Sequence, residues 1–374
     1  MFVLAAPGLA PLVQSELSDL PGVEVTDVGN DGRADVVLCT VDAGREAALL
    51  RLRTADDVFV ELGRTFRSEG DKPPWIVRRV LRPGRLEAAT GLWRSTNPGP
   101  GSRGRGGRAG RQRLTYRVVA RVLQERTWKR TELRRALDAG VSDAEPSWRA
   151  DDPAQIEVWA LEYTKGRFVA GLRLTTVRMR QHGGRESERP GALRPPVAAA
   201  MVALAGSPPD HRPGRAGRPD SPGRSGKSRS AGLSGTLLDP CCGSGTILAE
   251  AKAVGWEVEG RDIDASAVSA SRRNADTPHV QDGDARDLDL PDASVDAVVS
   301  NLPFGRQYAV QGDPAVWIAD VMAELARVTR PGGRVVLLVP ELPRSAVPSA
   351  LRLRDRHQVR LLGTTSTIWA YDRR

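Results

Sequence analysis

The sequence has few cysteines and no long hydrophobic run. Its 374 residues contain three cysteines, Cys39, Cys241 and Cys242, too few for a disulfide framework and without the spacing of a zinc site. No apolar run reaches the roughly 18 residues needed to cross a bilayer. The apolar start is interrupted by Pro7 and Pro11 and lacks a basic region, so we expect no signal peptide. These absences predict a cytoplasmic protein without a membrane segment or a bound metal.

Aromatic residues are also scarce, at 5%, whereas the 38 glycines and 27 prolines are clustered. Two stretches, 97–113 and 206–232, consist largely of Gly, Pro, Ser and Arg. Such composition cannot bury enough apolar surface to fold. We therefore expect a disordered insertion at the first stretch and a disordered linker at the second.

The net charge of +9 is unevenly distributed. From Leu233 onward there are 16 Lys and Arg against 19 Asp and Glu, and the preceding residues hold the other 39 and 27. The excess indicates that a polyanion such as RNA binds the N-terminal part, unless the arginines of the two low-complexity stretches only reflect biased composition. The stretch 121–135, with many cations around Trp128, suits phosphate and base contacts or, equally, a solvated helix face.

The order of predicted elements divides the chain into four parts. Residues 1–70 alternate short strands with a helix, as in a small α+β domain. Residues 71–190 read as a second α+β module that contains the insertion 97–113, and 191–235 as a connecting helix and linker. Residues 236–374 alternate strands and helices, which predicts a mostly parallel sheet covered on both faces. A final pair of strands predicts an antiparallel edge.

The first chemical motif is DPCCGSGT, Asp239–Thr246, between a predicted strand and a helix. Gly243 and Gly245 allow a sharp turn and close approach of a ligand, and the helix N-terminus offers free amide groups. Such a turn could serve a dinucleotide, S-adenosylmethionine (SAM), or the chain's own fold. Asp239 favours SAM, because a carboxylate can pair with its ammonium group and would repel a pyrophosphate.

Two acidic motifs follow the next two predicted strands. In Gly260–Asp264, Asp262 can accept hydrogen bonds from both ribose hydroxyls, while Asp264 is expected to cap the following helix. In Asp282–Ala285, Asp284 could accept from an adenine amino group, although an aspartate in a turn is often only a turn former. All three motifs follow strands, and the carboxyl edge of such a sheet is where ligands bind.

The fourth motif, SNLPFG (300–305), can clamp an exocyclic amine of a base. The Asn301 Oδ1 and the Leu302 carbonyl can accept its two hydrogens, and Pro303 restricts the backbone that holds this carbonyl. Phe304 can stack on a base turned out into the pocket. The alternative is a turn that closes the strand, with Phe304 in the core.

With these motifs together, residues 236–374 resemble class I SAM-dependent methyltransferases that act on amino groups, with Leu302 where proline is usual. The form Asn-Leu-Pro-Phe-Gly resembles the THUMP-domain RNA guanine-N2 methyltransferases, especially the tRNA branch that acts on an acceptor-stem guanosine. PGLAPLVQSEL and LRTADDVFVEL are similar to that family's ferredoxin-like domain. TYRVVARVL to WALEYTKGRFVAGLRL is similar to its THUMP module, and RPPVAAAMVALA to the helix before its catalytic domain.

The resemblance implies an α/β chain with a class I, Rossmann-like methyltransferase sheet after ferredoxin-like and THUMP α+β domains. It implies that SAM is held by Asp239, Cys241, Gly243, Gly245, Thr246, Asp262, Ile263, Asp264, Asp284, Ala285 and Asn301. It implies that the base is held by Asn301, Leu302, Pro303 and Phe304.

The predicted reaction is methyl transfer to the N2 amine of a guanosine in the tRNA acceptor stem, at position 6. The alternatives are guanine-N2 methylation of ribosomal RNA and adenine-N6 methylation of a nucleic acid. A glutamine methyltransferase uses a similar loop, but the basic N-terminal half disfavours it. The alternative outside enzymes is an RNA-binding protein with an inactive methyltransferase fold. The sequence leaves the oligomeric state open.

Overall fold

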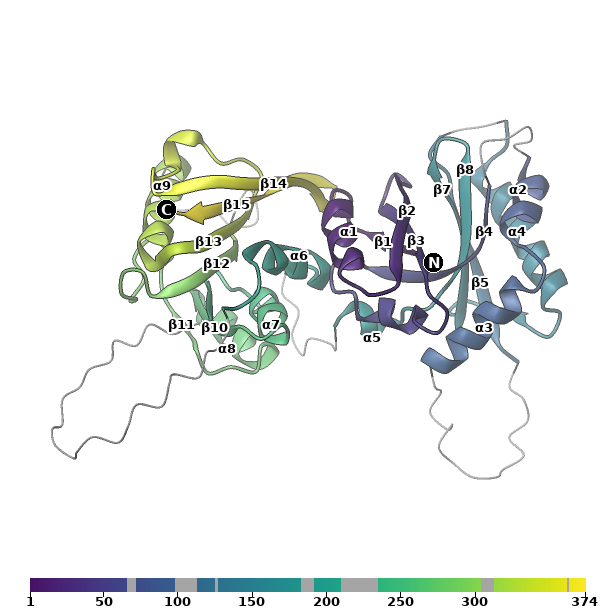
Figure 1. The fold of residues 1–374 in the computed structure, drawn as a ribbon, viewed down its shortest axis with the longest axis horizontal. Coiled ribbons are helices and arrows are strands. Elements are labelled where there is room, and N and C mark those ends of the chain that lie inside the picture. Colours follow the sequence, from purple (N-terminus) through teal and green to yellow (C-terminus); the bar gives the residue numbers. More distant parts are fainter. Residues whose placement is uncertain are drawn as a thin grey trace, which may run out of the picture. The chain divides into compact units, whose positions relative to one another are not determined.

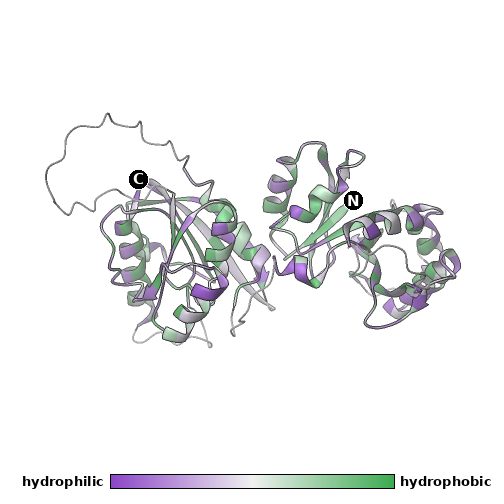
Figure 2. Cartoon of the chain, turned by 90° about the horizontal axis from the view of Figure 1, so that it is seen from below, coloured by the Kyte–Doolittle hydropathy of each residue, from purple (hydrophilic) through white to green (hydrophobic). Residues whose placement is uncertain are grey.

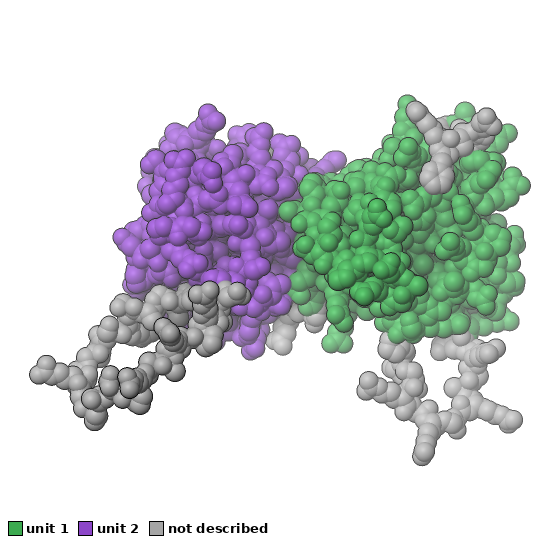
Figure 3. Space-filling model, in the orientation of Figure 1, with its two compact units in different colours: residues 1–183 green, residues 184–374 purple. Residues whose placement is uncertain are grey.

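The chain forms two compact units, Met1–Gly183 and Gly184–Arg374 (Figure 3). A computed structural model describes residues 1–65, 72–97, 113–124, 127–182, 192–209, 235–303, 313–361 and 363–374. The predicted insertion and linker lie almost entirely outside the described residues, and so does Phe304.

The first unit is built on one eight-stranded sheet with short helices (Figure 1). Its strands are β1 (Phe2–Ala5), β2 (Val23–Asn30), β3 (Asp35–Val41), β4 (Asp57–Arg64), β5 (Thr115–Arg121), β6 (Arg149–Ala150), β7 (Ile156–Thr164) and β8 (Arg167–Arg173). Its helices are α1 (Ala10–Ser18), the 3₁₀ helix η1 (Glu46–Arg51), α2 (Pro73–Val80), α3 (Arg85–Thr96), α4 (Arg130–Ala144) and α5 (Val177–Arg180).

The strand order of this sheet is β2-β3-β1-β4-β8-β7-β5-β6. Strands from both predicted N-terminal domains therefore share one sheet, joined where β4 pairs antiparallel with β8. The boundary between 1–70 and 71–190 stays a prediction. The predicted hairpin around Lys165 and Gly166 is confirmed, because β7 and β8 pair antiparallel and Gly166 has the left-handed φ of 76° that its tight turn requires.

Aromatic side chains fill much of the core of the first unit. The rings of Phe2 and Phe59 stack with centroids 4.6 Å apart, and Trp159 packs against Phe59. Trp128 is buried and lies 6.4 Å from the ring of Phe168. Neither alternative given for the stretch around Trp128, base contact or a solvated helix face, describes this side chain, because its ring packs in the protein interior.

The second unit is an α/β sandwich around a seven-stranded sheet. Its strands are β9 (Thr236–Asp239), β10 (Glu257–Asp262), β11 (Val280–Asp282), β12 (Val295–Asn301), β13 (Thr329–Val339), β14 (Leu351–Leu361) and β15 (Thr364–Arg373). Its helices are α6 (Pro195–Ala205), α7 (Thr246–Ala253), α8 (Ala265–Asn274), α9 (Pro314–Val328) and the 3₁₀ helix η3 (Arg344–Ala346).

The strand order is β11-β10-β9-β12-β13-β15-β14. The first five strands in this order run parallel to their neighbours, whereas β15 pairs antiparallel with both β13 and β14. Figure 1 shows helices on both sides of this sheet. The predicted fold class and the antiparallel edge are thus confirmed.

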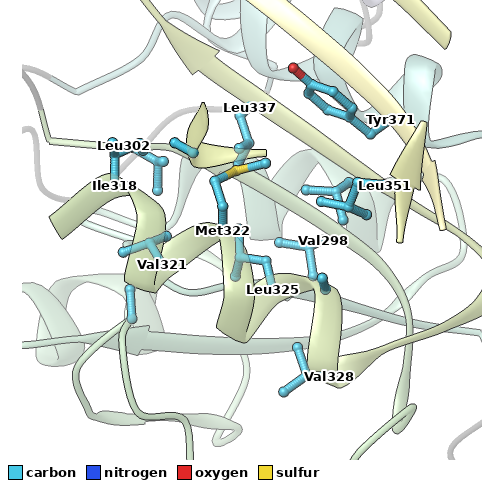
Figure 4. Close-up of a cluster of buried hydrophobic side chains, with 14 of the residues drawn as sticks. Val298, Leu302, Ile318, Val321, Met322, Leu325, Val328, Leu337, Leu351 and Tyr371 are labelled. Atoms are coloured by element: carbon cyan, nitrogen blue, oxygen red, sulfur yellow. The ribbon is translucent and has the colours of Figure 1, made fainter. Parts of the chain in front are cut away.

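Hydrophobic residues are concentrated along the strands, whereas the helices are mixed (Figure 2). The core of the second unit includes Val298 of β12, Leu337 of β13 and the buried face of α9. Leu302, just after β12, belongs to the same cluster and is 2% exposed; Figure 4 shows it beside Ile318 of α9. The side chain of Leu302, in the loop after β12, is therefore part of the core.

Candidate active site

The glycine-rich turn after β9 has a packed side and an open side. Gly243 and Gly245 both have left-handed φ values, 52° and 79°, which side chains disfavour. A Cβ on Gly245 would lie 2.9 Å from the Cα of Ser271 on α8, whereas a Cβ on Gly243 would meet nothing within 4 Å. Gly245 therefore lets two helices approach, and Gly243 leaves the space beside the turn free for a ligand.

Asp262, the last residue of β10, connects this turn to the next one. Its Oδ2 accepts a hydrogen bond from the Gly243 N–H at 2.8 Å, and its Oδ1 accepts from the Asp264 N–H at 3.0 Å. These two hydrogen bonds fix the side chain in place. Because each carboxylate oxygen has a second lone pair, Asp262 can still accept hydrogen bonds from two hydroxyls. Asp264 caps α8 by accepting from the Ser266 N–H at 2.8 Å, which confirms the predicted cap.

Asp239 is buried at the end of β9, with 1% of its surface exposed. Its Oδ1 accepts from the Ser300 hydroxyl at 2.7 Å and from the Cys241 N–H at 3.2 Å. Burial raises the pKa of Asp239 to about 7, and the nearby Asp262 also raises it, while the two hydrogen bonds oppose this. A cation placed against Asp239 would therefore stabilise its charged form.

Asp284 already has a strong partner in the neighbouring turn. The Arg286 guanidinium lies 2.6 Å from its Oδ2, and the Arg286 N–H donates to its Oδ1 at 2.9 Å. These hydrogen bonds from Arg286 lower the pKa of Asp284. An adenine amino group would therefore have to share this carboxylate with Arg286.

Other predicted cofactor residues differ in their surroundings. Ile263 is 81% exposed at the carboxyl end of β10, where an apolar ring could cover it. Ala285 is buried in the core, and Thr246 is buried at the first turn of α7. Cys241 is partly buried, and burial, followed by the nearby Asp239, raises the pKa of its thiol.

The predicted base clamp follows β12. Asn301 is the last residue of that strand and is partly exposed, as is Pro303. Leu302, between them, is anchored in the core. Phe304 lies outside the described residues.

Strand pairing brings these motifs to one edge. Asp239 stands opposite Gly260, Asp262 opposite Asp282, and Leu238 opposite Val298. The carboxyl ends of four neighbouring strands therefore carry the glycine turn, the acidic turns and the clamp. The residues fit SAM by their chemistry: a buried carboxylate for an ammonium, Asp262 for ribose hydroxyls, and open space at Gly243.

Two residues of this edge were not predicted from the sequence. Ser300 donates to Asp239 from the strand beside it, and Arg286 binds Asp284. In the sequence, only the position of Ser300 next to Asn301 pointed to a role in the site. That Ser300 binds Asp239 follows only from knowing that β9 and β12 are neighbours. In the described ranges, no group of His, Cys, Asp or Glu could hold a metal ion, and no helix combines the length and hydropathy of a membrane span.

Comparison with curated proteins gives matches that each cover less than half of this chain. The U6 snRNA (guanine-N(2))-methyltransferase THUMPD2 of Bos taurus is 36% identical over 114 residues, 28% of this chain and 22% of that protein. The tRNA (guanine(10)-N2)-dimethyltransferase of Methanothermobacter thermautotrophicus is 28% identical over 180 residues, 46% of each chain. The chain thus spans less than half the length of the curated relatives it matches.

Solved structures with a similar fold cover the whole chain. TrmN from Thermus thermophilus has a TM-score of 0.68 with 22% identity, and the alignment covers 100% of this chain and 99% of TrmN. SMU.472, complexed with SAH, has a TM-score of 0.62 with 13% identity, and the alignment covers 100% and 97%. Residues 230–362 match the family described as "RMKL-like, methyltransferase domain". The second unit is therefore similar to the methyltransferase domain of this family over residues 230–362, and the chain shares its fold with TrmN and SMU.472.

Proposed function

We propose that this chain is a SAM-dependent RNA methyltransferase that modifies the N2 amine of guanosine. The observation that carries the proposal is that Gly243, Asp262 and Asn301 lie together at one edge of the sheet. They follow or end the neighbouring parallel strands β9, β10 and β12. The family match supports methyl transfer. Relatives that modify guanine N2 in tRNA and in U6 snRNA support an RNA base as the acceptor.

The cofactor side of the site is formed by the carboxyl ends of β9, β10 and β11. Asp239 pairs with the ammonium group, Asp262 accepts from the ribose hydroxyls, and Ile263 lies against the adenine. The ammonium draws Asp239, whose pKa burial has raised to about 7, into its charged form. When bound, SAM supplies an electrophilic sulfonium methyl group, and the neighbouring SMU.472 structure, which holds SAH, supports this assignment.

The acceptor side is formed by the loop after β12. The guanine N2 lone pair is delocalised into the ring, so the nitrogen is a weak nucleophile until its hydrogens are held. The Asn301 Oδ1 and the Leu302 carbonyl accept those hydrogens and direct the lone pair to the methyl carbon. The nitrogen forms the new N–C bond while the C–S bond breaks with its electrons left on sulfur, and one N–H proton leaves to water.

Within this proposal, the substrate is tRNA and the target is an acceptor-stem guanosine at position 6, acted on in the cytoplasm. The form Asn301-Leu302-Pro303-Phe304 and the relative that modifies tRNA support tRNA. Nucleoside mass spectrometry of tRNA, ribosomal RNA and small nuclear RNA, with and without the gene, tests this choice. Loss of N2-methylguanosine from ribosomal RNA alone, or of N6-methyladenosine, would refute it.

The experiment that tests the chemistry replaces Asn301 with alanine. Asn301→Ala should leave SAM affinity, measured by calorimetry, within about threefold of the original, and should raise the barrier to methyl transfer by about 2–4 kcal/mol. The control is Asn97→Ala, whose amide donates to the Leu174 carbonyl at 3.1 Å within the first unit and touches neither the clamp nor the glycine-rich turn. Unchanged turnover in Asn301→Ala would refute the role of the clamp.

A further inference from the structure

The outer edge of the catalytic sheet is a strand rich in arginine. Strand β14, Leu351–Leu361, has the sequence LRLRDRHQVRL and pairs only with β15 among the described strands. Its four arginines, Arg352, Arg354, Arg356 and Arg360, are all exposed. At about 3.3 Å per residue they extend over about 26 Å.

This edge differs in charge from the rest of its unit. Residues 233–350 contain ten Lys and Arg against 17 Asp and Glu, whereas 351–374 contain six against two. Asp372 of β15 lies 3.0 Å from Arg352 and 3.4 Å from Arg354. Arg356 and Arg360 have no ion pair with any described residue, so the two cations farthest along β14 remain available to an external anion.

Strand register relates these cations to the proposed clamp. Asn301 stands opposite Leu338, Leu338 opposite Ile368, and Ile368 opposite His357. Three strand spacings of about 4.8 Å place the His357 backbone about 14 Å from that of Asn301 in the same row. Because β14 runs in the same direction as β12, Arg356 lies next to this row and Arg360 lies about 10 Å beyond it, toward the edge that carries the clamp.

An edge strand can also carry charge for another reason, because charged side chains prevent pairing with a second sheet. Either sign would serve that purpose, and in an otherwise acidic unit acidic residues would be equally suitable. Here the exposed charges are four arginines against one aspartate, Asp355. The sign, the missing ion pairs and the position in register with the clamp favour an anionic partner.

We propose that Arg356 and Arg360 on β14 bind phosphates of the RNA backbone next to the nucleotide held by the clamp. The inference rests on the proposed function, since the clamp defines where the target base lies. A base turned out of its stack brings its own backbone to the sheet edge, and phosphate contacts there fix register without reading sequence. The catalytic unit, acidic on average, thereby contributes its own cationic surface to RNA binding.

The test compares Arg356→Ala and Arg360→Ala with Arg273→Ala in the full-length protein. Arg273 is exposed on α8 and has no ion pair with a described residue, so each variant removes one surface charge. Binding of unfractionated tRNA is measured by fluorescence anisotropy across a salt series. Calorimetry measures SAM affinity.

Each β14 variant should weaken tRNA binding about threefold to tenfold at low salt and reduce the salt slope by about 0.7–0.9 per lost phosphate contact. SAM affinity should stay unchanged, and Arg→Lys should retain most of the binding. Affinities and slopes equal to those of Arg273→Ala would overturn the proposal. So would self-association with unchanged tRNA affinity, which would identify the arginines as protection against edge pairing.

When methyl transfer from SAM to tRNA is also measured on the original protein, the failures of the two proposals are distinguishable. An original protein that binds tRNA but transfers no methyl group refutes the enzymatic proposal, while the β14 contacts are still judged by anisotropy. An original protein that binds no RNA refutes both proposals.

Discussion

Replacing Asp239 with asparagine should make the free energy of unfolding of the SAM-free protein less dependent on pH. Asp239 is buried and its pKa is raised from 3.8 to about 7, with burial as the largest cause. Asparagine has nearly the same shape, and its oxygen can still accept from the Ser300 hydroxyl and the Cys241 N–H that bind Asp239 now. The substitution therefore removes the buried charge and leaves the packing.

The magnitude follows from linkage. Between pH 3.8 and about 7 the folded chain holds a proton on Asp239 that the unfolded chain has released. In this window the free energy of unfolding falls as the pH rises, and above about 7 the loss is complete. Each unit by which the folded pKa exceeds the unfolded one corresponds to about 1.4 kcal/mol of unfolding free energy. The full loss of stability is therefore about 4 kcal/mol, and about 2–3 kcal/mol of it occurs between pH 5 and pH 8. Asp239→Asn should abolish this contribution.

The assay is urea denaturation of the full chain and of Asp239→Asn at pH 5 and pH 8, without SAM. The variant should gain about 2–3 kcal/mol relative to the original protein between these pH values. It should also bind SAM about tenfold to a hundredfold more weakly at pH 8, because a charge-assisted hydrogen bond contributes about 1.5–3 kcal/mol. An identical stability difference at both pH values would show that Asp239 titrates as an ordinary carboxyl group and refute the reasoning.

Two further predictions separate structural from ligand-facing residues. Gly245→Ala should lower the free energy of unfolding in urea by about 1–3 kcal/mol, because the new Cβ would press on Ser271 at a left-handed φ. Gly243→Ala has open space around its Cβ. For each kcal/mol of stability lost, Gly243→Ala should therefore weaken SAM binding more than Gly245→Ala does. The reverse ranking would contradict the assignment of the open side. Leu302→Ala should cost about 2–4 kcal/mol of unfolding free energy, because it leaves a cavity beside α9; a cost below about 1 kcal/mol would show that this side chain is not part of the core.

Much of the site was predictable because its chemistry is local in sequence. Gly243 and Gly245 have left-handed φ values, which glycine adopts most readily, and Asp264 caps the helix that begins at the next residue. The hairpin at Gly166 and the helix after Arg194 follow from the same kind of short-range signal. Alternating strands and helices then imply a parallel sheet whose carboxyl edge collects these turns.

Other features depend on which strands become neighbours, and this the sequence pattern does not specify. Ser300 reaches Asp239 only because β12 lies beside β9. Trp128, surrounded by cations in the sequence, is buried because its ring packs near Phe168, 40 residues away. The average charge of the C-terminal part does not reveal its cationic edge, because all but one of the acidic residues lie outside β14, which carries four arginines.

The surroundings of Asn301 explain how one loop can combine an apolar and a catalytic role. The residue before it, Ser300, is fully buried and donates to Asp239, and the residue after it, Leu302, is buried against α9. The backbone of Asn301 is therefore fixed on one side by a polar contact to the proposed cofactor carboxylate and on the other by core packing. A clamp that works by orientation needs this rigidity, since small displacements of a positioned acceptor reduce the rate steeply. In the proposed mechanism, the buried leucine side chain therefore has a purpose, because it holds in place the backbone carbonyl that would accept from the substrate amine.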